Sequence, residues 1–251
     1  MVSALFTHIE SLQDSAPWGA FLDAGSGMNS SLWSTGLATD RWVGVTAAPG
    51  HARQIEAAVQ GRLRPQDRLV LGDWTNPEVL IGETFDTVLA DYLLGAVEGF
   101  SPYFQPQLFR RLRPLTGRVL YVVGLDPYVV GEAGTDAGRM VQAIGRLRDA
   151  CLLLAGETPY REYPMEWVLE TLAASGFEPI SARRFGNRYR AAWVNGQLDM
   201  AVRRVERFED RALAEAMSRR IEALRAEGLA LGRRDDGLRF GADYVIAARP
   251  V

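Results

Sequence analysis

The chain has 251 residues, of which 47% are hydrophobic and 24% charged, and its net charge is −3 at pH 7. A chain of this length buries roughly 70–75% of its unfolded surface, so we expect one large domain, or a core with a small appendage. No apolar run reaches the ~18 residues that cross a bilayer, and the first 14 residues contain no Arg or Lys, so neither a membrane span nor a signal peptide is predicted.

Lysine is missing from the chain, and histidine and cysteine are scarce, which argues against several classes of site. All 28 basic residues are arginine, which excludes a Schiff-base lysine and the lysine of a phosphate-binding P-loop. The chain has two histidines, His8 and His51, and one cysteine, Cys151, so we expect no metal site, no internal disulfide and a cytoplasmic protein. The slightly acidic balance predicts no general attraction to nucleic acid.

Short apolar runs alternate with helical patterns along the first two thirds of the chain. The runs predict strands at Ala20–Asp23, Trp42–Val45, Leu69–Leu71, Thr84–Ala90 and Arg118–Gly124. Helical spacing fills the intervals at Ser30–Leu37, His51–Gln60, Tyr103–Leu112 and Arg139–Ala155. Strands that alternate with helices predict right-handed crossovers and a parallel sheet covered on both faces.

The last third of the chain changes character. In order, it predicts a helix at Pro164–Ser175, a strand at Phe177–Phe185, a hairpin turn at Asn195-Gly196, a helix at Glu206–Glu227 ended by Gly228, and a final strand at Asp243–Ala248. We therefore expect an α/β fold: a Rossmann-like, doubly wound, mostly parallel seven-stranded sheet with helices on both faces. The expected organisation is a single domain, 1–251, with 186–240 as an insert or cap before the last strand.

The stretch Phe21–Gly27 carries the most specific signal, because a strand runs into two glycines and then into a helix. Glycines there let the backbone approach a ligand, and ligands of such sheets bind beyond the carboxyl ends of strands. A dinucleotide is disfavoured, since Ser30 takes the place of the third glycine and Asp23 would face the pyrophosphate. The acid that binds ribose is also missing, because the second strand ends at Thr46. A cation such as S-adenosylmethionine suits the Asp23 charge better.

This loop resembles the first motif of the class I S-adenosylmethionine-dependent methyltransferases, an acid followed by G-x-G, in Asp23-Ala24-Gly25-Ser26-Gly27. The resemblance covers about residues 16 to 185 and the last strand. It implies that Asp73 accepts from the adenine amino group and that Trp74 covers the ring. Gly44-Val45-Thr46 is similar to the branch with cyclopropane-fatty-acid synthases, which has threonine at this place. The implied cofactor-binding residues are Asp23, Gly25, Ser26, Gly27, Thr46, Asp73, Trp74 and Asp91.

Residues after the fourth and fifth predicted strands lie where an acceptor would meet the cofactor. No residue stands out as a general base, and the catalytic candidates are Asp91, Tyr92, Asp126 and Glu162. The candidates for binding the acceptor are Tyr92, Tyr128, Arg148, Tyr160, Arg161 and Tyr163. Two alternatives stay open: Arg161 pairs with Glu162 or solvent, and Arg148, next to Asp149, lies on a solvated helix face.

The resemblance implies an enzyme that transfers a methyl group to an O, N or C atom of a small molecule, as a monomer or a homodimer. The alternative is a non-catalytic protein that keeps a nucleoside pocket or binds a partner through the 206–227 helix. A nicotinamide-dependent oxidoreductase is disfavoured by Asp23 and the missing third glycine. A membrane partner is not predicted either, because acids balance the arginines of the 206–227 helix.

Overall fold

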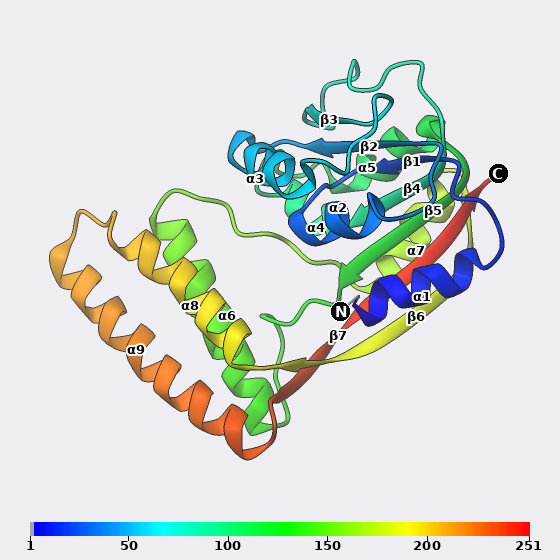
Figure 1. The fold of residues 1–251 in the computed structure, drawn as a ribbon. Helices are drawn as coiled ribbons and strands as arrows, with labels where there is room; N and C mark the ends of the chain where they lie inside the picture. Colours follow the sequence, from blue (N-terminus) through cyan, green and yellow to red (C-terminus); the bar gives the residue numbers. More distant parts are fainter. Residues whose placement is uncertain (1–2) are drawn as a thin grey trace. The chain divides into compact units, whose positions relative to one another are not determined.

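A computed structural model describes residues 3–251 and contains one seven-stranded sheet, in the order β3-β2-β1-β4-β5-β7-β6 (Figure 1). The strands are β1 (Ala20–Asp23), β2 (Arg41–Thr46), β3 (Arg68–Leu71), β4 (Phe85–Asp91), β5 (Thr116–Leu125), β6 (Phe177–Tyr189) and β7 (Leu238–Pro250). The pairs β1–β2, β2–β3, β1–β4 and β4–β5 are parallel, whereas β7 runs opposite to β5 in Figure 1. The doubly wound, mostly parallel sheet predicted from the sequence is confirmed.

The chain divides into two compact units. The first comprises Met1–Leu125, Arg161–Arg184 and Tyr244–Val251, and the second comprises Asp126–Tyr160 and Phe185–Asp243. Strands β6 and β7 cross the boundary, so each contributes residues to both units. The second unit therefore takes in the predicted insert, 186–240, together with 126–160, a segment that the sequence did not set apart.

Helices cover both faces of the sheet in the first unit (Figure 1). They are α1 (Ala4–Gln13), α2 (Met28–Ser34), α3 (Pro49–Val59), α4 (Leu93–Val97), α5 (Gln105–Leu112) and α7 (Met165–Ala174), with a 3-10 turn at Arg113–Leu115. Successive strand residues face opposite layers. Leu22 shares a buried core with Leu108 of α5 and Leu172 of α7, whereas the preceding Phe21 packs edge-on against Trp33 of α2. Burial on both faces explains why these strands are almost wholly apolar.

The direction of winding reverses between β1 and β4. After β1 the chain adds β2 and β3 on one side, then returns to place β4 on the other. Asp23, the last residue of β1, pairs with Leu89 of β4, and β4 ends two residues later at Asp91. The carboxyl ends of the two strands therefore lie side by side, which is where open sheets of this kind bind ligands.

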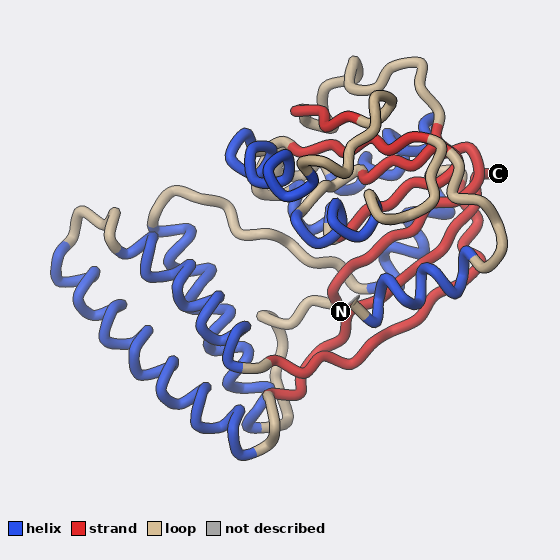
Figure 2. The backbone as a smooth tube through the Cα atoms, in the orientation of Figure 1, coloured by secondary structure: helices blue, strands red, loops and turns tan. Residues whose placement is uncertain are grey.

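Three helices make up most of the second unit, α6 (Asp136–Leu154), α8 (Ala191–Val205) and α9 (Arg211–Arg234), and each packs on the other two (Figure 2). The predicted hairpin at Asn195-Gly196 is wrong, because both residues lie inside α8. Helical spacing buries Val194, Leu198 and Ala201, and this burial outweighs the local turn preference of the dipeptide. The Asn195 side chain accepts a hydrogen bond from Arg225 of α9 at 2.9 Å.

The predicted helix at Glu206–Glu227 is also corrected. A helix begins only after the N-cap Asp210, whose side chain accepts from the Leu213 N–H, and it runs on to Arg234. Gly228 does not end it. A Cβ atom on Gly228 would lie 3.2 Å from Ile144 of α6, so the glycine allows close approach of the two helices.

The other predicted elements agree with the structure in type, and β1 also agrees in its bounds, whereas α1, α4 and α8 (Ala191–Val205) were not predicted. Strands β6 and β7 extend further than the predicted Phe177–Phe185 and Asp243–Ala248. Helix α2 ends at Ser34, before the predicted Leu37, and Cys151 is buried in α6. No helix within residues 3–251 is both long and apolar enough to cross a membrane.

Candidate functional site

The loop after β1 is tied to both neighbouring strands. The Ala24 N–H donates to Leu89 of β4 and the Ser26 N–H to Val45 of β2, each at 2.8 Å. The two glycines of the motif, Gly25 and Gly27, have different surroundings. A Cβ atom on Gly25 would lie 2.8 Å from the Cβ of Leu93, whereas one on Gly27 would meet no atom within 4 Å. Gly25 therefore permits packing, and Gly27 leaves open space beside the loop.

Asp23 is the most unusual group of this loop. Its side chain is 0% exposed, and within residues 3–251 neither carboxylate oxygen has a hydrogen-bond partner. Burial raises its pKa to about 7, and the surrounding Ser30, Ser26 and Ser31 oppose that shift only in part. A carboxylate in this position gains stability from any nearby positive charge, so the loop suits a cationic ligand.

The ends of β2 and β3 meet the same loop. The Gly72 N–H donates to the Thr46 carbonyl at 3.0 Å, and the Trp74 indole N–H donates to the Ala24 carbonyl at 2.7 Å. Trp74 is buried in the hydrophobic core, so its ring supports the loop from within. The structure thus brings the predicted cofactor residues of β1, β2 and β3 together.

Asp73, next to Trp74, is held by hydrogen bonds. Its carboxylate accepts from the N–H and the hydroxyl of Thr75 at 2.8 Å, and from the Ser101 hydroxyl at 2.8 Å. Burial would raise the pKa of Asp73, but these bonds outweigh it and lower the pKa below its ordinary value. Asp73 is therefore an oriented, ionised acceptor at the end of β3.

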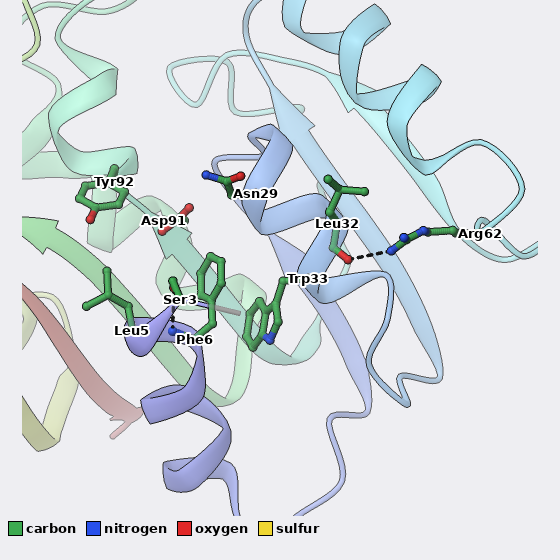
Figure 3. Close-up of a pocket in the computed structure, with 9 residues that line it drawn as sticks. All are labelled: Ser3, Leu5, Phe6, Asn29, Leu32, Trp33, Arg62, Asp91 and Tyr92. Atoms are coloured by element: carbon green, nitrogen blue, oxygen red, sulfur yellow. Dashed lines mark hydrogen bonds between the residues drawn. The ribbon is translucent and has the colours of Figure 1, made fainter. Parts of the chain in front are cut away.

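A cavity of about 510 Å³ adjoins the end of β4 (Figure 3). Its lining residues come from α1, α2, Arg62 and the end of β4: Ser3, Leu5, Phe6, Asn29, Leu32, Trp33, Arg62, Asp91 and Tyr92. Tyr92 has a left-handed backbone, with φ of 49°, and its N–H donates to Val123 of β5. Strained non-glycine residues of this kind cluster at functional sites. Two predicted site residues, Asp91 and Tyr92, therefore share one cavity.

Helix α1 is the part of this cavity that the sequence analysis missed. The Phe6 ring stacks on Trp33 at 4.4 Å, and the Trp33 indole N–H donates to Glu10 at 2.7 Å. The signal was present in the spacing of Phe6, Ile9 and Gln13, which repeats every three or four residues and marks a buried helix face.

The segment before α7 docks onto α4. The Arg161 N–H donates to the Gly95 carbonyl at 3.2 Å, and its guanidinium lies 3.3 Å from the buried Glu98. A Cβ atom on Gly95 would lie 2.6 Å from the Glu162 carboxylate, so this acid also lies against α4. The Tyr163 ring stacks on Trp167, at 4.1 Å. These three predicted site residues belong to the first unit, and Arg161 pairs with Glu98.

The other predicted acceptor residues belong to the second unit. Arg148 is mostly buried, lies 2.6 Å from Asp149 and donates to the Tyr128 hydroxyl at 2.7 Å. This placement corrects the solvated-face alternative for Arg148. The Asp126 N–H donates to a carbonyl of β7, and Tyr160 is half exposed. The predicted site residues thus divide between the two units.

Metal binding finds no support in the part of the chain that the structure describes. Residues 3–251 hold no group of three or more His, Cys, Asp or Glu side chains placed to bind an ion.

Comparison with known proteins identifies solved structures with the same fold, but it finds no relative by sequence. No family model matches the chain, and no curated protein matches it. A proposed methyltransferase from Bacillus halodurans superposes with a TM-score of 0.62 over 99% of both chains, at 14% identity. A mycolic acid cyclopropane synthase complexed with SAH superposes with a TM-score of 0.58, at 16% identity, over 97% of this chain and 83% of that one. The chain has the fold of the class I S-adenosylmethionine-dependent methyltransferases.

A third structure on this methyltransferase fold is coclaurine N-methyltransferase bound to N-methylheliamine and SAH. It superposes with a TM-score of 0.55, at 14% identity, over 98% of this chain and 71% of that one. The fold expected from the Asp23 motif is thereby confirmed. At these identities the likeness is one of fold, and function depends on the site residues.

Proposed function

We propose that the protein is an S-adenosylmethionine-dependent methyltransferase that acts on a small molecule. The observation that carries this proposal is the fully buried Asp23 carboxylate, whose pKa is raised, in a glycine loop at the switch point of this fold. A buried charge without a partner is costly, and the ammonium and sulfonium groups of S-adenosylmethionine would offset that cost. The open space at Gly27 supports a ligand at the same place.

Each strand end has a proposed role in holding the cofactor. The backbone from Gly25 through Ser26 to Gly27 would lie against it, the Thr46 hydroxyl would bind a ribose hydroxyl, and Asp73 would accept from the adenine amino group. Trp74 supports the loop through Ala24. When bound, S-adenosylmethionine supplies an electrophilic methyl group, which passes to a nucleophilic atom of the acceptor and leaves S-adenosylhomocysteine.

The cavity at the end of β4 is the proposed place for the acceptor. Its volume of about 510 Å³ falls within the range of roughly 300–1,000 Å³ that is usual for small-molecule sites. Asp91 and Tyr92 line it and would orient the acceptor or take a proton from it. Asp126 and Glu162 stay candidates for proton transfer, and the residues proposed for acceptor binding elsewhere are Tyr128, Arg148, Tyr160, Arg161 and Tyr163.

Calorimetry with S-adenosylmethionine, S-adenosylhomocysteine and NAD tests the cofactor. We expect the first two to bind and NAD not to bind. Asp23→Asn removes the charge at nearly constant shape, and Gly27→Val fills the open space; each should weaken binding about tenfold or more, a change of ~1.4 kcal/mol.

The matched control is Asp40→Asn, which removes an exposed carboxylate outside the loop and should leave binding unchanged. Binding of NAD alone would favour the oxidoreductase alternative. A folded protein that binds none of the three ligands would favour the non-catalytic alternative.

A further inference from the structure

The cavity between α1, α2 and the end of β4 has a largely aromatic wall. Phe6 and Trp33 stack face to face, with their ring centroids 4.4 Å apart and an interplanar angle of 6°, and Tyr92 lies across from them in Figure 3. We call Phe6, Trp33 and Tyr92 the aromatic wall. Leu5 and Leu32 complete the apolar lining. A ligand that fills this space therefore has an apolar or polarisable body.

The described residues that line the cavity include one acidic and one basic side chain, and of the two only the acid lies at the end of β4. Asp91 is the one acid among the described residues that line it, and Arg62 is the one base. The Arg62 guanidinium donates to the Leu32 carbonyl at 3.0 Å, away from Asp91 in Figure 3. The other polar lining residues, Ser3 and Asn29, are neutral. The end of the cavity beside Asp91 thus combines a carboxylate with aromatic rings, and both attract organic cations.

The cavity adjoins the proposed cofactor residues and has only Asp91 in common with them. Asn29 stands in the first turn of α2, directly after the Gly27 loop, and Asp91 ends the strand beside β1. Asp23, Thr46 and Asp73, in contrast, are not among the residues that line it. The cavity is therefore placed for a second molecule next to the cofactor.

We propose that this cavity recognises the methyl acceptor through an organic ammonium group, which pairs with Asp91 and lies against the aromatic wall. The proposal deepens the proposed function and rests on it, because it names the class of acceptor.

The wall is fixed before any ligand binds. Trp33 is held by its hydrogen bond to Glu10 and by an edge contact with Trp18 at 5.8 Å, and Ser3 caps α1 by accepting from the Phe6 N–H. A preformed aromatic surface reduces the entropy that binding would otherwise consume.

Two soluble molecules of nearly equal shape test this recognition: choline, which carries a quaternary ammonium, and 3,3-dimethylbutan-1-ol, its neutral analogue. Calorimetry in saturating S-adenosylhomocysteine should show choline binding about tenfold or more tightly. Asp91→Asn should abolish this preference. Phe6→Leu keeps the apolar volume but removes a ring face, and it should weaken choline binding more than binding of the alcohol.

The matched controls are Glu56→Gln, an exposed acid of α3, and Tyr103→Leu, an aromatic residue that is 79% exposed; both lie outside the cavity lining and should keep the preference. Thermal unfolding checks that each variant is folded.

Three results would overturn the proposal: equal affinity for the two molecules, a preference that survives Asp91→Asn, or loss of choline binding when S-adenosylhomocysteine is added. The last result would assign the ammonium subsite to the cofactor. A parallel titration without S-adenosylhomocysteine distinguishes failure of the ammonium subsite from failure of the proposed function. If S-adenosylhomocysteine fails to bind while Asp91-dependent choline binding persists, the proposed function fails and the ammonium subsite stands.

Discussion

Asp23 carries its carboxylate where solvent does not reach it, and the surrounding Ser30, Ser26 and Ser31 stabilise the charge only in part. Its pKa of about 7 in the folded chain lies above the value of 3.8 that an unperturbed aspartate has. The folded state therefore holds a proton over this interval that the unfolded state has lost. The contribution of this group to stability is fully present below pH 4 and is lost as the pH rises to 7.

This linkage makes Asp23→Asn a stabilising substitution at high pH. At pH 8 the wild-type carboxylate is charged and buried, so the neutral amide should raise the free energy of unfolding by up to about 4 kcal/mol. At pH 4 the Asp23 carboxyl is protonated in the folded chain and about half protonated in the unfolded chain, so the difference should be far smaller. Thermal unfolding at the two pH values measures this, and an equal effect at both would contradict the raised pKa.

Trp74 shows how one residue can match a motif and have a different role. The sequence predicts a ring that covers the adenine, whereas the structure shows a buried indole that donates to the Ala24 carbonyl. The hydrogen bond joins the end of β3 to the glycine loop, 50 residues earlier in the chain. Trp74 would therefore affect the cofactor by positioning Ala24 and its neighbours.

At the scale of an element, α9 depends on one glycine for its place in the second unit. Gly228 faces α6, where an added Cβ would lie 3.2 Å from Ile144 and 3.4 Å from Val194 of α8. Gly232, one turn further on in the same helix, has its nearest neighbour, Leu238, at 3.8 Å, which is an ordinary contact. The two glycines are thus a matched pair in one helix.

Substitutions at the two positions should have opposite effects. Gly228→Leu must push α9 away from α6 and α8, and it should lower the free energy of unfolding by about 1–3 kcal/mol. Gly232→Ala should raise it by up to about 1 kcal/mol, because alanine has the higher helix propensity and meets no obstacle. Denaturant unfolding measures both, and a Gly228→Leu variant as stable as wild type would show that the contact is not tight.

Helix α1 illustrates a limit of local patterns at this scale. The spacing of Phe6, Ile9 and Gln13 indicates a buried face, but it does not indicate what that face contacts. Only the fold places Phe6 on Trp33, 27 residues away, and makes Leu5 and Ser3 part of the cavity.

At the scale of the whole molecule, the net charge follows directly from the amino-acid composition. The chain carries a charge of −3, and its bases are all arginines, of which several are held in ion pairs such as Arg204–Glu157 and Arg249–Glu178. Paired arginines are less available to phosphate groups. This charge distribution opposes any general attraction to nucleic acid.

A duplex DNA of arbitrary sequence should therefore not bind at about 150 mM salt. Fluorescence anisotropy of a labelled duplex measures this, with a titration at low salt to reveal weak electrostatic attraction. Salt-dependent binding with a Kd near the ~10⁻⁶ M end of the range for non-specific binders would contradict the prediction.

The sequence by itself determined the strands of a doubly wound, mostly parallel sheet and the Asp23 loop. Apolar runs, glycines and turn residues influence the backbone over a few positions, so strands and loops of this kind can be predicted from short stretches of sequence. β1 was located to the residue, and the loop that follows it proved to stand at the switch point.

The tertiary structure decided what depends on residues far apart in the chain. It made Asn195-Gly196 part of a helix because α8 packs on α6 and α9 and buries Val194, Leu198 and Ala201. It also kept Gly228 inside α9 and paired Arg148 with Asp149 and Tyr128. It also buried the Asp23 carboxylate and raised its pKa. Burial and pairing come from long-range packing, whose energies exceed local preferences of about 1 kcal/mol or less per residue, and no short window of sequence contains them.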